Sequence, residues 1–403
     1  DGHGTIWGAV NAQGGNVIME DGSAIQNLSG RAIFLDSSFA TINGTIQNIR
    51  PLDTMKDADA GLAVYIWSDG KTNDIVSKAT LGSTGKITNI IGNGYGECDT
   101  LIMARNSGST FKMEYGAEIT NIKKTAVLYP VYSSETDPVT INGRVANCDS
   151  SDDGYLFRGF GAHTVFDTQS IIENNKSSSN GVFYSTNGVE YTFRGTIRNN
   201  NALRLIYLID HSGAPCKGTI EDGALITGNS GIAVYINQSA SLTMTGGEIS
   251  DNGTGVSLSG KNAQSFTMTG GKIVDNNIGI SYSSMKPQTW VKLQGGEVSG
   301  NGSDYQVAAR YGSSKDDEAH LEVSADVLQG NTSIALGLGT ITLDNGYADI
   351  ALGTASDSAE AKIASLLEDG HTGWETVSSY ALWFKPTTDS FHFTMPKSYS
   401  VEN

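Results

Sequence analysis

One short pattern recurs along this chain and constrains its fold more than any other feature. The segments LTMTGGEISDN, FTMTGGKIVDN and VKLQGGEVSGN occupy residues 242–252, 266–276 and 291–301. Each alternates apolar and polar residues, breaks at a glycine pair and ends in asparagine, and the terminal asparagines are 24 and 25 residues apart. A period of this size is typical of a solenoid, in which stacked turns share one continuous core.

Weaker copies of the pattern extend it over most of the chain, such as TINGTIQN at 41–48 and TINGRVAN at 140–147. The predicted corner residues, one per turn, are Asn27, Asn48, Asn89, Asn121, Asn147, Asn174, Asn199, Asn229, Asn252, Asn276, Asn301 and Asn331. Each turn reads as three short strands separated by glycine or asparagine corners. We therefore expect about twelve parallel turns spaced about 4.8 Å apart, with the asparagines stacked in a ladder.

These repeats resemble the right-handed parallel β-helix superfamily, which includes pectate lyases, polygalacturonases, tailspikes and many bacterial surface proteins. The resemblance covers roughly residues 5–345, and the TMTGGxIxxN repeat looks most like extracellular proteins of gut-type bacteria. It implies an all-β, right-handed parallel β-helix over residues 1–345 and a location outside the cell or on the bacterial cell surface. Because enzymes and adhesins share this fold, the resemblance alone does not choose between them.

The C-terminal part differs in pattern and is predicted to form a small α/β cap over residues 346–403. AEAKIASLLEDG at 359–370 has apolar residues at helical spacing, whereas YALWF at 380–384 and FHFTM at 391–395 read as strands. A cap is expected because the open end of a solenoid exposes unpaired strand edges. Residues 1–20, or an additional module or subunit, are expected to cover the N-terminal end.

Composition excludes several classes of protein. The net charge is -17 and no Lys/Arg cluster occurs, which argues against nucleic acids and anionic membranes as partners. No apolar run reaches 18 residues, so we expect no membrane span. The three cysteines, Cys98, Cys148 and Cys216, form no CxxC motif and are odd in number, so a disulfide framework is not expected. Each is interpreted as a small buried residue.

The irregular turns between residues 48 and 229 are where a functional site is expected, because their extra residues must leave the solenoid as loops. In the regular turns, the strand after the corner ends in Asn237, Ser259 or Ser283, whereas charged residues take this place in the irregular turns. Carboxylates, arginines and aromatic rings together are typical of carbohydrate sites. The predicted substrate-binding residues are Trp67, Asp69, Arg105, Arg158, Tyr184, Tyr207 and His211.

Asp210 is the first candidate catalytic residue, and Asp152 and Asp153 are its candidate partners. Two turns of about 4.8 Å would place them roughly 10 Å apart, near the upper end of the spacing in inverting glycosidases, about 6.5–9.5 Å. The alternative interpretation is structural: SSDDG would be a solvated turn, and Asp210 would cap backbone amides at a corner.

No HxH or HExxH spacing occurs, so no zinc site is expected, and His163 is interpreted as a loop histidine. No other cofactor is expected. The resemblance to pectate lyases implies that Ca²⁺ is possible, held by aspartates in adjacent turns. The sequence has no recognisable cluster of such aspartates. The favoured hypothesis is an extracellular glycoside hydrolase acting on complex host or plant glycans. The alternatives are a surface adhesin or structural stalk, and a polysaccharide lyase.

Overall fold

The computed structural model describes residues 8–51, 62–67, 76–93, 100–105, 108–151, 154–178, 181–210, 213–259, 264–282 and 289–307, and the backbone of further strands between 319 and 394. Every element in this part of the chain is a β-strand, which confirms the all-β prediction. Within these ranges there is no helix long and apolar enough to cross a membrane.

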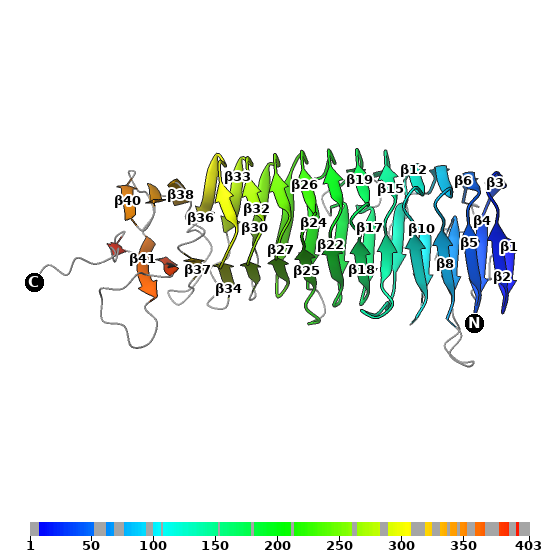
Figure 1. Ribbon diagram of the computed structural model, residues 1–403, viewed down its shortest axis with the longest axis horizontal. Helices are drawn as coiled ribbons and strands as arrows, with labels where there is room; N and C mark the ends of the chain where they lie inside the picture. Colours follow the sequence, from blue (N-terminus) through cyan, green and yellow to red (C-terminus); the bar gives the residue numbers. More distant parts are fainter. Residues whose placement is uncertain are drawn as a thin grey trace, which may run out of the picture. The chain divides into compact units, whose positions relative to one another are not determined.

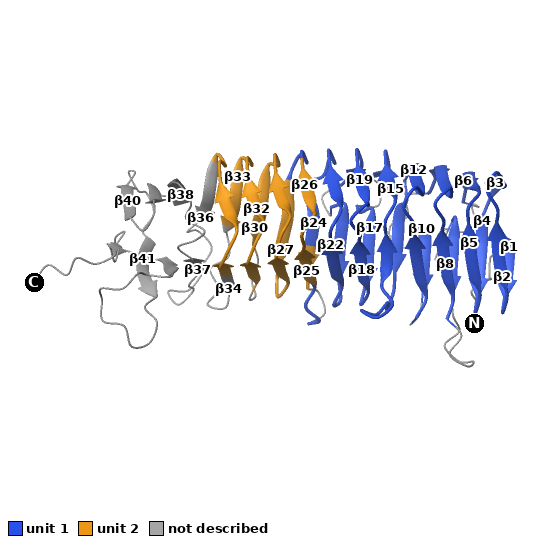
Figure 2. Cartoon of the chain, in the orientation of Figure 1, with its two compact units in different colours: residues 1–207, 211–216, 228–231 blue, residues 208–210, 217–227, 232–403 orange. Residues whose placement is uncertain are grey.

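The chain divides into two compact units (Figure 2). Unit 1 comprises residues 1–207, 211–216 and 228–231, and unit 2 comprises residues 208–210, 217–227 and 232–403. In each unit, successive turns add one strand to each of three parallel sheets, so the predicted β-solenoid is confirmed (Figure 1).

The strands of unit 1 form three sheets with parallel neighbours. Sheet A contains β1 (Gly8–Gln13), β4 (Arg31–Asp36), β7 (Val64–Trp67), β10 (Thr100–Arg105), β13 (Ala126–Pro130), β17 (Phe157–Phe160), β21 (Phe183–Thr186) and the start of β24 (Arg204–Ile209). Sheet B contains β2 (Asn16–Met19), β5 (Phe39–Ile42), β8 (Lys78–Leu81), β11 (Thr110–Met113), β14 (Val139–Ile141), β18 (His163–Phe166) and β22 (Glu190–Phe193). Sheet C contains β3 (Ala24–Ser29), β6 (Thr45–Arg50), β9 (Lys86–Ile91), β12 (Glu118–Lys123), β15 (Arg144–Ala146), β19 (Ile171–Glu173) and β23 (Thr196–Arg198), with the short strands β16 (Asp149–Ser150) and β20 (Lys176–Ser177) beside them.

Unit 2 repeats this arrangement. Its sheet A contains β27 (Ile232–Asn237), β30 (Thr254–Leu258), β33 (Ile278–Tyr282) and β36 (Ser303–Val307). Its sheet B contains β25 (Lys217–Ile220), β28 (Ser241–Met244), β31 (Ser265–Met268), β34 (Thr289–Leu293) and β37 (Ala319–Ser324). Its sheet C contains β26 (Leu225–Thr227), β29 (Glu248–Ser250), β32 (Lys272–Val274) and β35 (Glu297–Ser299).

The core of unit 1 includes aromatic rings that stack from turn to turn. Phe157 and Phe183 are register partners with ring centroids 5.0 Å apart, and Phe166 and Phe193 stack in the same way at 5.3 Å. The two stacks meet edge to face, with the Phe166 and Phe183 centroids 4.9 Å apart. Identical side chains in register thus provide the continuous core that the repeat predicted.

The corner asparagines form two columns rather than the single predicted ladder. The first column occupies a left-handed backbone position, with φ of 54–57° at Asn27, Asn48, Asn89, Asn121, Asn147, Asn174 and Asn199. In unit 2, Asp251, Asp275 and Gly300 hold this position instead. The second column is one residue further along, where Asn252 and Asn276 are buried. The prediction merged the columns because asparagine, aspartate and glycine all tolerate positive φ.

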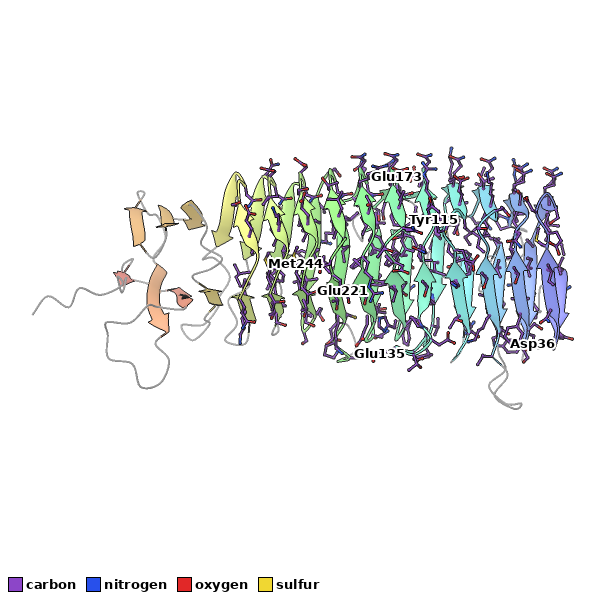
Figure 3. The ribbon with its side chains drawn as sticks, in the orientation of Figure 1. Asp36, Tyr115, Glu135, Glu173, Glu221 and Met244 are labelled. Carbon is purple, nitrogen blue, oxygen red and sulfur yellow. The ribbon has the colours of Figure 1, made fainter. Side chains whose placement is uncertain are left out.

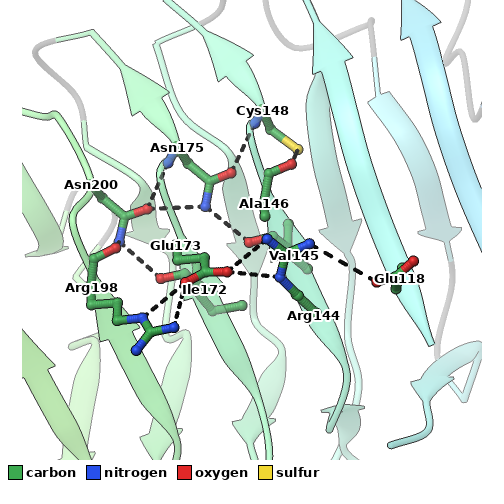
Figure 4. Close-up of polar contacts among 10 residues, drawn as sticks. All are labelled: Glu118, Arg144, Val145, Ala146, Cys148, Ile172, Glu173, Asn175, Arg198 and Asn200. Atoms are coloured by element: carbon green, nitrogen blue, oxygen red, sulfur yellow. Dashed lines mark hydrogen bonds and ion pairs between the residues drawn. The ribbon is translucent and has the colours of Figure 1, made fainter. Parts of the chain in front are cut away.

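The second column forms a buried hydrogen-bond ladder, and Figure 4 shows the contact between Asn175 and Asn200. Asn175 Nδ2 donates to Asn200 Oδ1 at 3.0 Å, and Asn200 Nδ2 donates to Asn229 Oδ1 at 3.1 Å. In unit 2, Asn252 and Asn276 make the same donation to Asn276 and Asn301. In earlier turns the same inward position is occupied by isoleucine, at Ile49, Ile90 and Ile122. Cys148 occupies it in the turn before the first buried asparagine, Asn175.

The number of turns is close to the prediction. Asn331 begins β38 (Asn331–Leu336), which pairs in parallel with β36 and antiparallel with the strand that follows it. One prediction about the C-terminal part is wrong. The helix predicted within 359–370 is replaced over its first part by β41 (Ala359–Leu366). Ala361 and Ile363 also fit a two-residue period, and antiparallel pairing with β42 (Ser379–Pro386) satisfies the backbone.

The other C-terminal strands are β39 (Gly339–Asp344), β40 (Tyr347–Leu352) and β43 (His392–Thr394). Strands β42 and β43 confirm the two strands predicted at 380–384 and 391–395. The boundary predicted at residue 345 and the capping role of the segment after it stay predictions.

Candidate functional site

One outward column of sheet A in unit 1 gathers aromatic and arginine side chains. Val64, Ile102 and Leu128 are register partners buried in the core. Because side chains alternate across a strand, the next residue of each turn points away from the core. In order along the sheet, this outward column contains Phe34, Tyr65, Met103, Tyr129, Arg158 and Tyr184. The column and its neighbours Arg31, Trp67, Tyr155 and Tyr207 are called the aromatic face.

At its N-terminal end, the aromatic face holds a cation against buried rings. The rings of Phe34 and Tyr65 stack at 5.6 Å, and Trp67 lies 6.4 Å from Phe34. The guanidinium carbon of Arg31 is 4.3 Å from the centroid of Tyr65, within the range of cation–π attraction. Burial lowers the pKa of Arg31 to about 10, against the opposing effect of Tyr65, so the side chain stays charged at neutral pH.

Arg158 organises the other end of the aromatic face. Its Nη1 donates to the hydroxyl of Tyr155 at 2.8 Å, and its guanidinium carbon lies 4.9 Å from the centroid of Tyr129. Tyr155 stacks on Tyr184 at 5.5 Å, and Tyr184 contacts Tyr207 at the same centroid distance. Arg158 and Tyr207 are buried, whereas Tyr129 and Tyr184 are half-buried, so parts of these two rings face solvent.

The structure brings together several of the predicted site residues. Arg158, Tyr184 and Tyr207 form one connected cluster, and Trp67 is the register partner of Arg105, which is exposed at the end of β10. Asp210 follows β24 directly and is only 5% exposed. Asp69, Asp152, Asp153 and His211 lie outside the described residues. The pairing of Asp210 with Asp152 or Asp153 therefore stays a prediction.

Six members of the aromatic face are not among the predicted site residues: Arg31, Phe34, Tyr65, Met103, Tyr129 and Tyr155. Phe34, Tyr65 and Met103 lie in the same register column as Tyr129. The available signal was the two-residue alternation within the third strand of each turn, aligned from turn to turn. The charged residues that mark the predicted site lie at strand ends, whereas these three side chains lie within their strands.

A groove of about 630 Å³ lies over sheet C of unit 1. Its lining residues, which define the asparagine groove, are Asn27, Leu28, Ser29, Asn48, Ile49, Arg50, Asn89, Ile91, Asn121 and Lys123. The four asparagines belong to the left-handed column, and Asn48 Nδ2 donates to Asn27 Oδ1 at 3.1 Å. The groove thus combines amide donors and acceptors, aliphatic carbons and two cationic side chains, a mixture suited to a polar ligand with many hydroxyl groups.

A third cluster comprises Glu135, His163 and Glu190, whose potential ligand atoms all lie within 4.8 Å of one another. In Figure 3, Glu135 lies at the opposite edge of unit 1 from Glu173. The prediction of no zinc site was based on the absence of HxH and HExxH spacing in the sequence. These three residues are 28 and 27 positions apart, about one turn of the irregular repeat each, so no local motif could have revealed them.

The fold and these surfaces define a parallel β-solenoid protein with polar and aromatic surfaces on its N-terminal unit. Neither a scan against protein-family models nor a search of curated proteins finds a match to this chain. The function must therefore be argued from the surfaces themselves.

Proposed function

We propose that this protein is an extracellular or cell-surface glycoside hydrolase of bacterial type that binds complex glycans over the aromatic face. The observation that carries the proposal is the pair of half-buried rings of Tyr129 and Tyr184, which lie on either side of Arg158 in the outward column. Aromatic rings offer apolar faces that suit the C–H faces of sugars, and a few well-placed polar groups set the orientation of the ligand.

Asp210 is the proposed catalytic carboxylate, with Asp152 or Asp153 as its partner. Asp210 is 5% exposed and follows the strand that carries Tyr207. Glycosidases need two carboxyl groups that flank the scissile bond, one of which donates a proton to the leaving oxygen. No metal ion is needed for this step.

A second candidate function is adhesion to glycans without cleavage, and the asparagine groove favours it. No carboxylate occurs among its lining residues, whereas Asn27, Asn48, Asn89 and Asn121 repeat one amide at each successive turn. A periodic row of amides suits repeated hydroxyl groups along a glycan chain but supplies no general acid.

The test is a sugar-release assay on a mixed panel of mucin, milk-oligosaccharide and plant glycans. Wild type and Asp210→Asn are assayed in parallel with Asp21→Asn, which changes an exposed turn carboxylate. We expect release by wild type and by Asp21→Asn, and a loss of about 10²–10⁴-fold in rate for Asp210→Asn, the usual contribution of a general acid or base.

Other outcomes separate the alternatives. Release that is unaffected by Asp210→Asn would keep the hydrolase and reject the proposed site. Binding to the same panel without release, weakened by Arg50→Ala in the asparagine groove, would support the adhesin. A chain that neither binds nor cleaves any of these glycans would contradict both proposals.

A further inference from the structure

Three separate segments of unit 1 converge on the cluster of Glu135, His163 and Glu190. His163 begins β18, Glu190 begins β22, and the two are register partners on neighbouring parallel strands. Glu135 belongs to the loop between β13 and β14. One potential ligand atom from each side chain lies within 4.8 Å of the others.

The loop that carries Glu135 is fastened on both sides of that residue. Ser133 Oγ donates to the carbonyl of His163 at 2.8 Å and accepts from its amide at 2.9 Å. Tyr132 packs edge to face on Phe160 with centroids 5.4 Å apart. On the other side, Asp137 forms an ion pair with Lys78 at 2.5 Å. The Glu135 carboxylate is therefore presented from a backbone that is held in place.

One ring nitrogen of His163 has a hydrogen-bond partner and the other has none. Its Nε2 lies 3.3 Å from Thr192 Oγ1, whereas Nδ1 is buried and has no hydrogen-bond partner. When Nε2–H donates to the threonine, Nδ1 carries a lone pair. In histidines that ligate metals, the other ring N–H characteristically donates a hydrogen bond to a nearby acceptor, which fixes the tautomer and the ring orientation.

We propose that Glu135, His163 and Glu190 bind one divalent transition-metal ion, for which Zn²⁺ is the best-matched class. A neutral imidazole with two carboxylates balances the charge of the ion and supplies the mixed nitrogen and oxygen ligands that Zn²⁺ accepts at three protein positions, leaving a fourth for water or a ligand. Ca²⁺ takes six to eight oxygen ligands and fits this set poorly. The ion would tie the loop of Glu135 to two consecutive turns of sheet B.

The experiment uses the full chain, freed of any affinity tag and treated with chelator, and titrates it with Zn²⁺ by calorimetry. We expect one ion per chain in wild type and a rise in the unfolding temperature that EDTA reverses. Glu135→Gln and His163→Gln should each weaken binding at least tenfold. Glu20→Gln, which changes an exposed turn carboxylate, is the matched control and should bind like wild type.

Thr192→Val removes only the partner of Nε2 and should weaken Zn²⁺ binding about 10–100-fold, the usual effect of losing such a contact. Co²⁺ in place of Zn²⁺ should give visible absorption bands in wild type that are lost in His163→Gln. Glu135 is exposed, so its variant is expected to fold even if a histidine variant does not. Wild-type affinity in Glu135→Gln, or no stoichiometric binding by wild type, would overturn the proposal and leave an ordinary ion-pair cluster.

Discussion

At the scale of single residues, the buried asparagines contribute to stability through the hydrogen bonds that their side chains make in the interior. Asn276 is 2% exposed, and the two N–H groups of its Nδ2 are shared among three acceptors, the carbonyls of Ile249 and Val274 and Asn301 Oδ1. Its Oδ1 accepts from both the amide and the side chain of Asn252. A fully satisfied network of this kind rigidifies the interior, whereas a half-satisfied one is costly.

Asn276→Ala should therefore lower the free energy of unfolding by about 3 kcal/mol, because several buried groups lose their partners together. Urea unfolding followed by circular dichroism measures this loss. Asn174→Gly is the matched control, since it removes an exposed asparagine from the left-handed column, where glycine adopts the same φ without strain. A cost for Asn276→Ala no larger than that of the control would contradict the role of the ladder.

Glu173 is the second residue whose environment decides its behaviour (Figure 4). Its side chain is 9% exposed, and its two oxygens accept from Arg144 at 2.7 Å and from Arg198 at 2.8 Å. Burial by itself would raise the pKa of the carboxyl group, but hydrogen bonds from the two arginines outweigh it, so the pKa lies below 4.5. Such a group stabilises the fold above its unfolded pKa and loses that contribution as pH falls through the folded value.

Glu173→Gln should lower the free energy of unfolding by about 2 kcal/mol at pH 7, because charge-assisted hydrogen bonds are lost. The difference between wild type and variant should shrink as the pH falls, because the unfolded chain takes up the proton at the ordinary glutamate pKa and the folded carboxyl group does so only at its lower pKa. Urea midpoints at pH 7 and pH 3.5 test this expectation. A difference that is equal at both pH values would show that the charge of Glu173 contributes nothing.

At the scale of the element, each turn depends on backbone conformations that only certain residues adopt. Gly271 has φ of +89°, and a Cβ at this position would lie 2.6 Å from both the Gly246 carbonyl oxygen and Met244 Cε. The glycine pair of the repeat therefore serves both the corner and the close approach of the preceding turn.

Gly271→Ala should cost about 2 kcal/mol or more, because it combines a strained φ with a clash against backbone. Gly15→Ala is the control, since open space surrounds its position, and its cost should stay within about 0.5 kcal/mol. Thermal unfolding of the two variants measures both values. Equal stability of the two would mean that the corner relaxes to accept a side chain.

At the scale of the whole molecule, the stacked turns of unit 1 enclose a buried interior, and two cysteines lie in it. Cys148 and Cys216 are cysteines of unit 1, 1% and 0% exposed, which confirms their interpretation as small buried residues. Burial raises the pKa of Cys148 to about 12, so its thiol is protonated as well as inaccessible at pH 8.

In a Cys98→Ser variant, neither remaining thiol should react with a thiol reagent at pH 8 until urea unfolds the protein. The rate of labelling should then follow the rate of unfolding measured by circular dichroism, because both thiols need the turns around them to open. Rapid labelling in native buffer would show that unit 1 opens locally around these residues.

The repeat, the three strands per turn, the glycine and asparagine corners and the buried cysteines could all be predicted from the sequence, because they depend on local periodicity and on the φ preferences of single residues. Which asparagine of each corner faces inward could not be predicted, since a shift of one residue exchanges the two sides of a strand. Stacking also brought Phe34, Tyr65 and Arg31 onto one face, and joined Glu135, His163 and Glu190 from three turns. Such contacts lie about 4.8 Å apart in space but more than twenty residues apart in sequence, so local patterns do not reveal them.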